Sequence, residues 1–105
     1  MLYHIAEADR WDEARSAGIY TVSTLGLDLA EVGFIHLCTA EQLDGVAARF
    51  YRGVDGLVLL HIDDDLLDAP VELEAVGESG ERFPHLYGPL PTDAVVAVEA
   101  FSAPS

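Results

Sequence analysis

The chain has 105 residues, of which 50% are hydrophobic and 23% are charged. A chain of this length is typical of one domain with its own core, so we expect a single domain over residues 1–105. The hydrophobic content excludes an intrinsically disordered protein. No apolar run approaches the roughly 20 residues that a membrane span needs, so we expect no membrane insertion.

The charge is strongly one-sided. Nineteen acidic residues face five basic ones, and the formal net charge is −14. The field of such a chain repels phosphates, so we expect no non-specific binding to nucleic acid or to anionic membranes. An anionic small molecule is a candidate ligand only where an arginine or backbone N–H groups overcome the net charge locally.

Two features of the sequence indicate the cell compartment. The N-terminal segment has no basic residues and meets Glu7 and Asp9 at once, so we expect no signal peptide. The single cysteine, Cys38, has no partner for an internal disulfide. We therefore expect a cytoplasmic protein.

In the first half of the chain, alternating apolar residues predict a strand at Leu2–Ala6. Apolar residues at helical spacing predict a helix at Ala8–Ala17, which Gly18 ends. A helical turn at Leu27–Val32 and a strand at Phe34–Cys38 follow.

A capping box, formed by Thr39 and Gln42, predicts the start of the next helix. Its apolar stripe runs from Leu43 to Tyr51, and Gly53 is expected to end it. Downstream we expect strands at Leu57–Ile62, Val71–Val76 and Ala94–Phe101, a helical turn at Leu66–Leu67, a turn at Gly77–Gly80 and an extended segment at Arg82–Tyr87. Two helices among about six strands, without regular alternation, predict the α+β class.

Four histidines, His4, His36, His61 and His85, lie in or beside expected strands. Imidazole suits proton transfer, hydrogen bonding and metal binding. The alternative is that each ring bonds a backbone carbonyl at the edge of the core. Because no ligand spacing accompanies the histidines beyond the pair of His36 and Cys38, we expect no metal site. Cys38 lacks the cationic neighbours that activate a thiol, so we expect no nucleophilic triad.

The segment 83–91 reads Phe-Pro-His-Leu-Tyr-Gly-Pro-Leu-Pro. Its prolines restrict the backbone, and in an extended chain His85 and Tyr87 point to the same side. The segment is either a rigid wall of a ligand pocket or a packed turn with a tyrosine anchor. The sequence leaves both interpretations open.

Two motifs carry a resemblance to a known family. Gly-Phe-Ile-His-Leu-Cys-Thr at 33–39, followed by Glu41-Gln42, and Phe-Pro-His-Leu-Tyr-Gly-Pro-Leu at 83–90 resemble domain-of-unknown-function family 952, a group of small, mostly bacterial proteins. The resemblance runs nearly the whole chain, from Tyr3-His4-Ile5 to the strand that ends at Phe101. Cys38 stands where that family usually has serine.

The resemblance implies a fold similar to the ADP-ribosyltransferase superfamily, which is α+β with a split, bent mixed sheet of about six strands and two main helices. Members of that superfamily bind NAD in the cleft between the halves of the sheet, so NAD is a candidate substrate or ligand and no resident cofactor is required. The candidate catalytic residues are His36, His85 and Glu74. The candidate ligand-binding residues are His4, Phe34, Tyr87, Arg49 and Arg82.

The chemistry of these residue types is coherent with that assignment. A carboxylate at Glu74 would favour the positive charge that builds on ribose when the nicotinamide bond breaks. The ring of Phe34 or Tyr87 would stack on nicotinamide, and an arginine would pair with the pyrophosphate. Arg49 is explained equally well by its place near the C-terminal end of a helix.

Two functional hypotheses therefore remain. One is an ADP-ribosyltransferase-like enzyme, and the other is a non-catalytic module of the same fold that binds a small ligand or a protein. Convergence of His36, His85 and a carboxylate on one cleft would favour a functional site.

Overall fold

The computed structural model describes residues 1–77 and 79–105. Six strands form two three-stranded antiparallel sheets in the orders β1-β6-β10 and β5-β8-β7. Their bounds are β1 Leu2–Glu7, β5 Ile35–His36, β6 Leu57–Ile62, β7 Val71–Ala75, β8 Arg82–Leu86 and β10 Val95–Phe101. Four short strands pair separately as β2-β9 and β3-β4; they are β2 Ile19–Tyr20, β3 Val22–Thr24, β4 Leu27–Asp28 and β9 Leu90–Pro91.

The helical elements connect these strands. The α-helices are α1 Ala8–Ala17, α2 Leu29–Val32 and α3 Leu43–Phe50, and the 3₁₀ turns are η1 Ala40–Gln42, η2 Asp64–Leu66 and η3 Thr92–Ala94. Among the described residues, no helix combines the length and the apolar composition that crossing a membrane requires.

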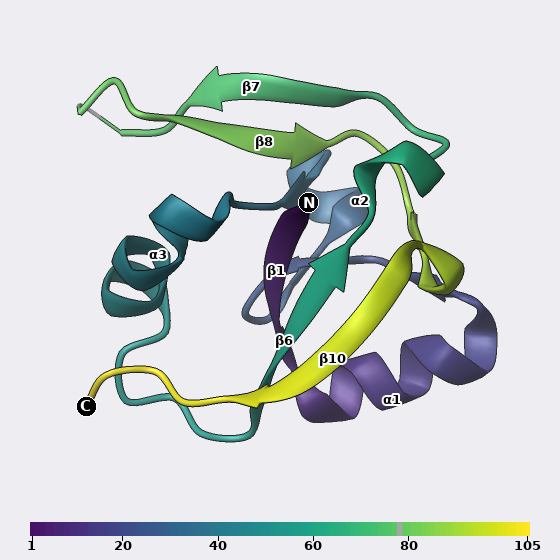
Figure 1. Cartoon of the computed structure of the whole chain (residues 1–105), viewed down its shortest axis with the longest axis horizontal. Helices are drawn as coiled ribbons and strands as arrows, with labels where there is room; N and C mark the ends of the chain where they lie inside the picture. Colours follow the sequence, from purple (N-terminus) through teal and green to yellow (C-terminus); the bar gives the residue numbers. More distant parts are fainter. Residues whose placement is uncertain (78) are drawn as a thin grey trace.

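Within the part of the chain that the structure describes, one isolated bridge joins the two three-stranded sheets. The N–H of Tyr3 donates to the carbonyl of Cys38 at 2.8 Å, and the N–H of Cys38 donates back at 2.9 Å. The six strands thus follow one another in the order β7-β8-β5-β1-β6-β10. In Figure 1, β7 and β8 cross the top of the view at a steep angle to β1, β6 and β10. The fold is therefore α+β, as expected. Its strand pairs are antiparallel rather than mixed, and the described residues form ten strands and three α-helices rather than about six strands and two main helices.

We call the line along which the two sheets meet, between β5 and β1, the seam. Few residues pair along it, for a local reason. The N–H of Leu37 donates to the carbonyl of Pro84 at 3.0 Å, and Pro84 has no N–H to extend the ladder. The expected strand Phe34–Cys38 is therefore reduced to two paired residues, Ile35 and His36. Beyond them the chain leaves β8 and bonds β1 instead.

Alternation along β6 builds two cores on opposite faces of its sheet. Leu60 and Ile62 pack in one buried cluster with Trp11 of α1. Leu57 and Leu59 pack in the other with residues of α3. α1 and α3 thus cover opposite faces of this sheet. The cluster on the α1 side also includes Leu86 of β8, and α3 lies below the β7-β8 hairpin in the view of Figure 1.

Several predicted boundaries hold and others shift. The helix at Ala8–Ala17 is confirmed with its ends, and Gly18 closes it in the left-handed region at φ 86°. The capping box of Thr39 and Gln42 forms as predicted, but it opens the 3₁₀ turn η1 before α3 begins. The expected turn Gly77–Gly80 includes Glu78, which lies outside the described residues.

Candidate functional site

Three rings meet on the face of the β5-β8-β7 sheet that is turned toward α3. His36 of β5 and His85 of β8 are direct cross-strand partners, so their side chains share that face. The ring of Phe34 stacks on His85 with centroids 4.0 Å apart and planes 15° apart. The ring of His36 stands edge-on to both, at 4.8 Å from Phe34 and 5.1 Å from His85. Residues from two distant motifs thus form one aromatic cluster.

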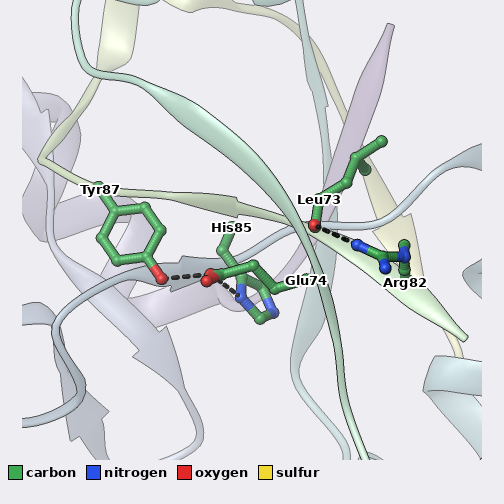
Figure 2. A network of polar contacts seen from close by, with 5 residues as sticks. All are labelled: Leu73, Glu74, Arg82, His85 and Tyr87. Carbon is green, nitrogen blue, oxygen red and sulfur yellow. Dashed lines mark hydrogen bonds and ion pairs between the residues drawn. The ribbon is translucent and has the colours of Figure 1, made fainter. Parts of the chain in front are cut away.

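A carboxylate joins this cluster from β7. Oε1 of Glu74 accepts a hydrogen bond from Nδ1–H of His85 at 2.9 Å and a second, short one from the hydroxyl of Tyr87. Figure 2 shows Tyr87, Glu74 and His85 linked in this order. The expectation that His85 and Tyr87 point to the same side is therefore confirmed. His36, His85 and a carboxylate also come together, but of these three only His36 lines the pocket described below, whereas the hypothesis of a functional site asked for one shared cleft.

The hydrogen bonds set the ionisation of this network. The bond from Tyr87, and then the bond from His85, lower the pKa of Glu74. The same carboxylate raises the pKa of Tyr87. Burial, and then the neighbouring His85, lower the pKa of His36. Near neutral pH we therefore expect Glu74 to be ionised, Tyr87 protonated and His36 uncharged.

His85 is held in one tautomer with one nitrogen unused. Because its Nδ1–H donates to the carboxylate, Nε2 carries the lone pair in the neutral ring. Nε2 is buried and has no hydrogen-bond partner among the described residues. A carboxylate that orients an imidazole in this way prepares the other nitrogen to accept a proton.

A pocket of about 100 Å³ adjoins the cluster. It is a little smaller than the roughly 150 Å³ cavity that accepts a benzene ring in an engineered protein. Its walls are mainly aromatic and aliphatic and include Tyr3 and Ile5 of β1, Phe50 and Tyr51 at the end of α3, Phe83 of β8, and His36. His36 thus belongs to both the cluster and the pocket, so a ligand ring in the pocket would lie beside the cluster.

His4 holds the backbone of His36 in position through a hydrogen bond. Its Nδ1–H donates to the carbonyl of His36 at 2.6 Å, and the hydroxyl of Tyr20 donates to its Nε2 at 3.0 Å. Burial lowers its pKa to about 4, so the ring is neutral. Although His4 borders the pocket, both of its nitrogens are occupied within the protein. This corrects its assignment as a ligand-binding residue, because His4 positions the backbone of His36 instead.

The structure separates the two candidate arginines. The Arg49 guanidinium lies 5.1 Å from the ring centre of Phe50, a wall of the pocket, and its Nη2 lies 3.6 Å from the place of a Cβ on Gly77. Arg49 is therefore at the edge of the pocket. Arg82 donates to the carbonyl of Leu73 at 3.4 Å (Figure 2). Since it alternates with Phe83 along β8, its side chain leaves from the opposite face, which corrects its placement in the site.

Comparison with known proteins places the chain in a family. A family model described as a protein of unknown function, DUF952, matches residues 5–98. The chain belongs to the DUF952 family. A crystal structure of protein CC0527 from Caulobacter crescentus matches this DUF952 chain with a TM-score of 0.83 and 35% identity, covering 96% of this chain and 85% of that one.

A solution NMR structure of CC0527 matches with a TM-score of 0.78 and 38% identity, over 96% of this chain and 84% of that chain. No curated protein matches the sequence. The family and the fold of this DUF952 protein are thereby established, and its function has to be argued from the site.

Cys38, the residue that departs from the serine usual at this place in the family motif, borders the pocket of this DUF952 chain. Burial raises the pKa of its thiol to about 12, so the thiolate is not populated near neutral pH. Among the described residues, no group of three or more histidine, cysteine or acidic side chains is arranged to hold a metal ion.

Three pocket residues, at β1, β3 and the C-terminal end of α3, were not predicted from the sequence. Tyr3, Thr24 and Tyr51 all border the pocket, and Tyr51 donates to the carbonyl of Ile5 at 3.3 Å. The alternation of Tyr3 with Ile5 was a usable signal, because it places both on one face of β1. Nothing local indicated that this face would meet α3.

The Glu74–Tyr87 bond gives a direct prediction for this DUF952 protein. We expect Glu74→Gln to lower the pKa of Tyr87 toward 10, because the negative acceptor that disfavours the phenolate is removed. The ¹³Cζ chemical shift of Tyr87, followed against pH, measures this. Glu72→Gln is the matched control and should shift the pKa less, since Glu72 contributes only charge. An unchanged pKa in Glu74→Gln would contradict the bond.

Proposed function

We propose that this DUF952 protein binds a nucleotide in the cleft beside Glu74 and His85, with NAD as the first candidate, and that it acts on the bond between nicotinamide and ribose as ADP-ribosyltransferases do. The observation that carries the proposal is the aromatic cluster of His36, Phe34, His85 and Tyr87, next to an aromatic pocket. Two of its members, His85 and Tyr87, donate to one carboxylate. Packing alone does not require a histidine, a phenol and a carboxylate to meet in this way.

The reaction would use the ionised carboxylate and the unused imidazole nitrogen. When the glycosidic bond breaks, its electron pair leaves with the nicotinamide nitrogen and positive charge develops on the ribose. Glu74, whose pKa is lowered by its two donors, would stabilise that charge. A water or an acceptor hydroxyl then supplies an electron pair to the sugar carbon, and its proton would go to Nε2 of His85.

One end of the ligand would lie in the pocket, and the other end would lie on the face of the β5-β8-β7 sheet. The pocket, at about 100 Å³, would hold part of a flat ring, and Phe50 and Tyr51 offer ring faces and edges to it. The guanidinium of Arg49 at the pocket edge would pair with a phosphate. The rest of the ligand would lie beside Glu74 and Tyr87, whose side chains are exposed.

One observation favours a second candidate, a non-catalytic module on the same fold. The chain carries a formal net charge of −14. Of the two candidate arginines, neither is among the described residues that line the pocket, and only Arg49 lies beside a wall residue, Phe50. A field of this sign weakens the binding of a dianionic pyrophosphate. A ligand with less negative charge would avoid that cost, so the protein would then bind such a ligand without turnover.

The test is a calorimetric titration of the wild-type protein with NAD, ADP-ribose and nicotinamide. We expect His85→Ala to weaken NAD binding at least about tenfold, because the loss of one good hydrogen bond to a ligand is about 1.4 kcal/mol. Arg82→Ala is the matched control, since this residue lies on the same strand but on the opposite face, and it should bind as the wild type does. No binding at millimolar concentrations, or equal binding by His85→Ala, would refute the nucleotide proposal.

Catalysis is tested separately by the release of nicotinamide from NAD. Glu74→Gln should bind NAD but release nicotinamide at least about a hundredfold more slowly, as expected when a charge that stabilises a transition state is removed. Binding of NAD without any release by the wild type would identify the non-catalytic module instead.

A further inference from the structure

A second group of polar side chains lies on the other three-stranded sheet. Tyr3 and His61 are direct cross-strand partners of β1 and β6, and their ring centres are 5.0 Å apart in an edge-on arrangement. Oε2 of Glu99, from β10, lies 3.3 Å from Nε2 of His61. We call Tyr3, His61 and Glu99 the β6 group. Tyr3 also borders the pocket. The β6 group therefore adjoins the pocket, and it lies on the other side of the seam from His85.

Unpartnered nitrogens single out this group. Within the described part of the chain, three buried side-chain polar atoms have no hydrogen-bond partner: Oγ of Ser23, Nε2 of His61 and Nε2 of His85. His61 is within ion-pair distance of Glu99, but the contact is not aligned as a hydrogen bond. Buried polar atoms in native proteins are nearly always bonded, so each of these atoms calls for an explanation, such as a bound water, an ion, a ligand or a role in chemistry.

The two histidines are alike only in part. Each has a buried Nε2 without a hydrogen bond to the described residues, and each lies beside a tyrosine or phenylalanine ring. They differ in the nitrogen that lies next to a glutamate, which is Nδ1 in His85 and Nε2 itself in His61. One contributes to the site described above, and the other has no role there. A ligand that satisfied both nitrogens would have to reach across the seam between β5 and β1.

The chemistry of the β6 group indicates what it would bind. The side chain of Glu99 is 61% exposed, so its carboxylate can accept hydrogen bonds from a ligand while repelling phosphate. An imidazole nitrogen pairs with a hydroxyl as donor or acceptor. A carboxylate that accepts from ribose hydroxyls is the same chemistry by which dinucleotide-binding folds hold the sugar. The vicinal hydroxyls of a sugar fit these groups better than an anion does.

We propose that the β6 group is a second subsite that binds the hydroxyls of a second sugar, so that the ligand of this cleft is a dinucleotide rather than a mononucleotide. This inference rests on the proposed function, because it assumes that a nucleotide occupies the cleft. It adds residues on the opposite sheet and a size requirement for the ligand.

Calorimetric titrations with NAD and with nicotinamide mononucleotide test the proposal. Glu99→Gln and His61→Ala should each weaken NAD binding at least about fivefold, or about 1 kcal/mol, and leave binding of the mononucleotide unchanged. For Glu99→Gln, the direction of the change in NAD affinity is informative. Removing a negative charge near an anionic ligand should otherwise tighten binding, so a weakening indicates direct contact. Val98→Ala, a neighbour on β10 that points to the other face, should change neither affinity.

The outcomes separate this inference from the proposed function. If NAD binds equally well or more tightly to Glu99→Gln and His61→Ala, but poorly to His85→Ala, the second subsite is wrong and the proposed function stands. If both ligands weaken equally in these variants, the requirement for a second sugar is wrong. If the wild type binds neither ligand at millimolar concentrations, both proposals fail. Because Glu99 is largely exposed, Glu99→Gln is expected to fold, and it keeps the test decisive should His61→Ala unfold.

Discussion

Replacing His4 by alanine should lower the free energy of unfolding by about 4 kcal/mol. His4 is 2% exposed and holds the hydroxyl of Tyr20 and the carbonyl of His36. Its removal leaves both groups unbonded in the interior, at about 1–3 kcal/mol for each, and opens a cavity where the ring was. Urea unfolding at pH 7 measures the loss. A loss below about 1 kcal/mol would mean that water replaces the ring without cost.

The same histidine makes stability depend on pH. Its pKa is lowered to about 4 in the folded protein by burial, against about 6.5 in an unfolded chain. Between these values the unfolded state binds more protons, so the stability present above pH 6.5 is lost as the pH falls toward 4. Full protonation corresponds to a loss of about 3 kcal/mol.

A variant isolates this contribution from those of the many carboxylates. His4→Asn keeps a donor near the carbonyl of His36 but does not titrate, so its stability should change less than that of the wild type between pH 7 and pH 4. The difference between the two urea curves measures the contribution of His4. Parallel pH profiles for the two proteins would contradict a neutral, buried imidazole at this position.

The second large effect is expected at Gly88, which follows Tyr87. A Cβ on Gly88 would lie 2.5 Å from the Cβ of Ala69, whereas packed carbon atoms are about 3.5–4.0 Å apart. Neither Cβ can rotate away, because each is fixed to its backbone. Gly88→Ala must therefore push the two segments apart, and we expect a loss of about 2 kcal/mol, as for other overpacked sites.

A double-mutant cycle tests this explanation. Ala69→Gly removes the opposing atom, so Gly88→Ala should cost much less in that background. The displacement should also disturb the neighbouring bond from the N–H of Tyr87 to the carbonyl of Pro70, 2.9 Å long, and with it the contact of Tyr87 with Glu74. An equal cost in both backgrounds would show that the collision with Ala69 is not the cause.

The sequence predicted elements well where their signals are local. The bounds of α1 follow from apolar spacing and from Gly18, and β6 has the bounds that its apolar run indicated. Tyr87 and His85 share a side because the segment is extended, and this also follows from alternation alone. The short strands β2, β3, β4 and β9 were not predicted, because strands of two or three residues have no periodicity to detect.

The candidate site was predictable only in part, because its geometry depends on residues that lie far apart in the chain. The motifs indicated which residues carry chemistry, but Arg49 and Arg82 looked equivalent until their faces were known. The role of His4 depended on Tyr20 and on the carbonyl of His36, both far from it in the chain. His61 stood inside an apolar strand, and no pattern in the sequence connected it with Glu99.

The sequence by itself determined the α+β class, the helices and the side of each strand on which the polar side chains lie, because these depend on residues a few positions apart. Only the tertiary structure decided that Glu74, His85 and His36 meet and that Arg82 stays away. The pairing of His36 with His85 and the bridge between Tyr3 and Cys38 join distant segments, and their register depends on how two cores pack rather than on local preference.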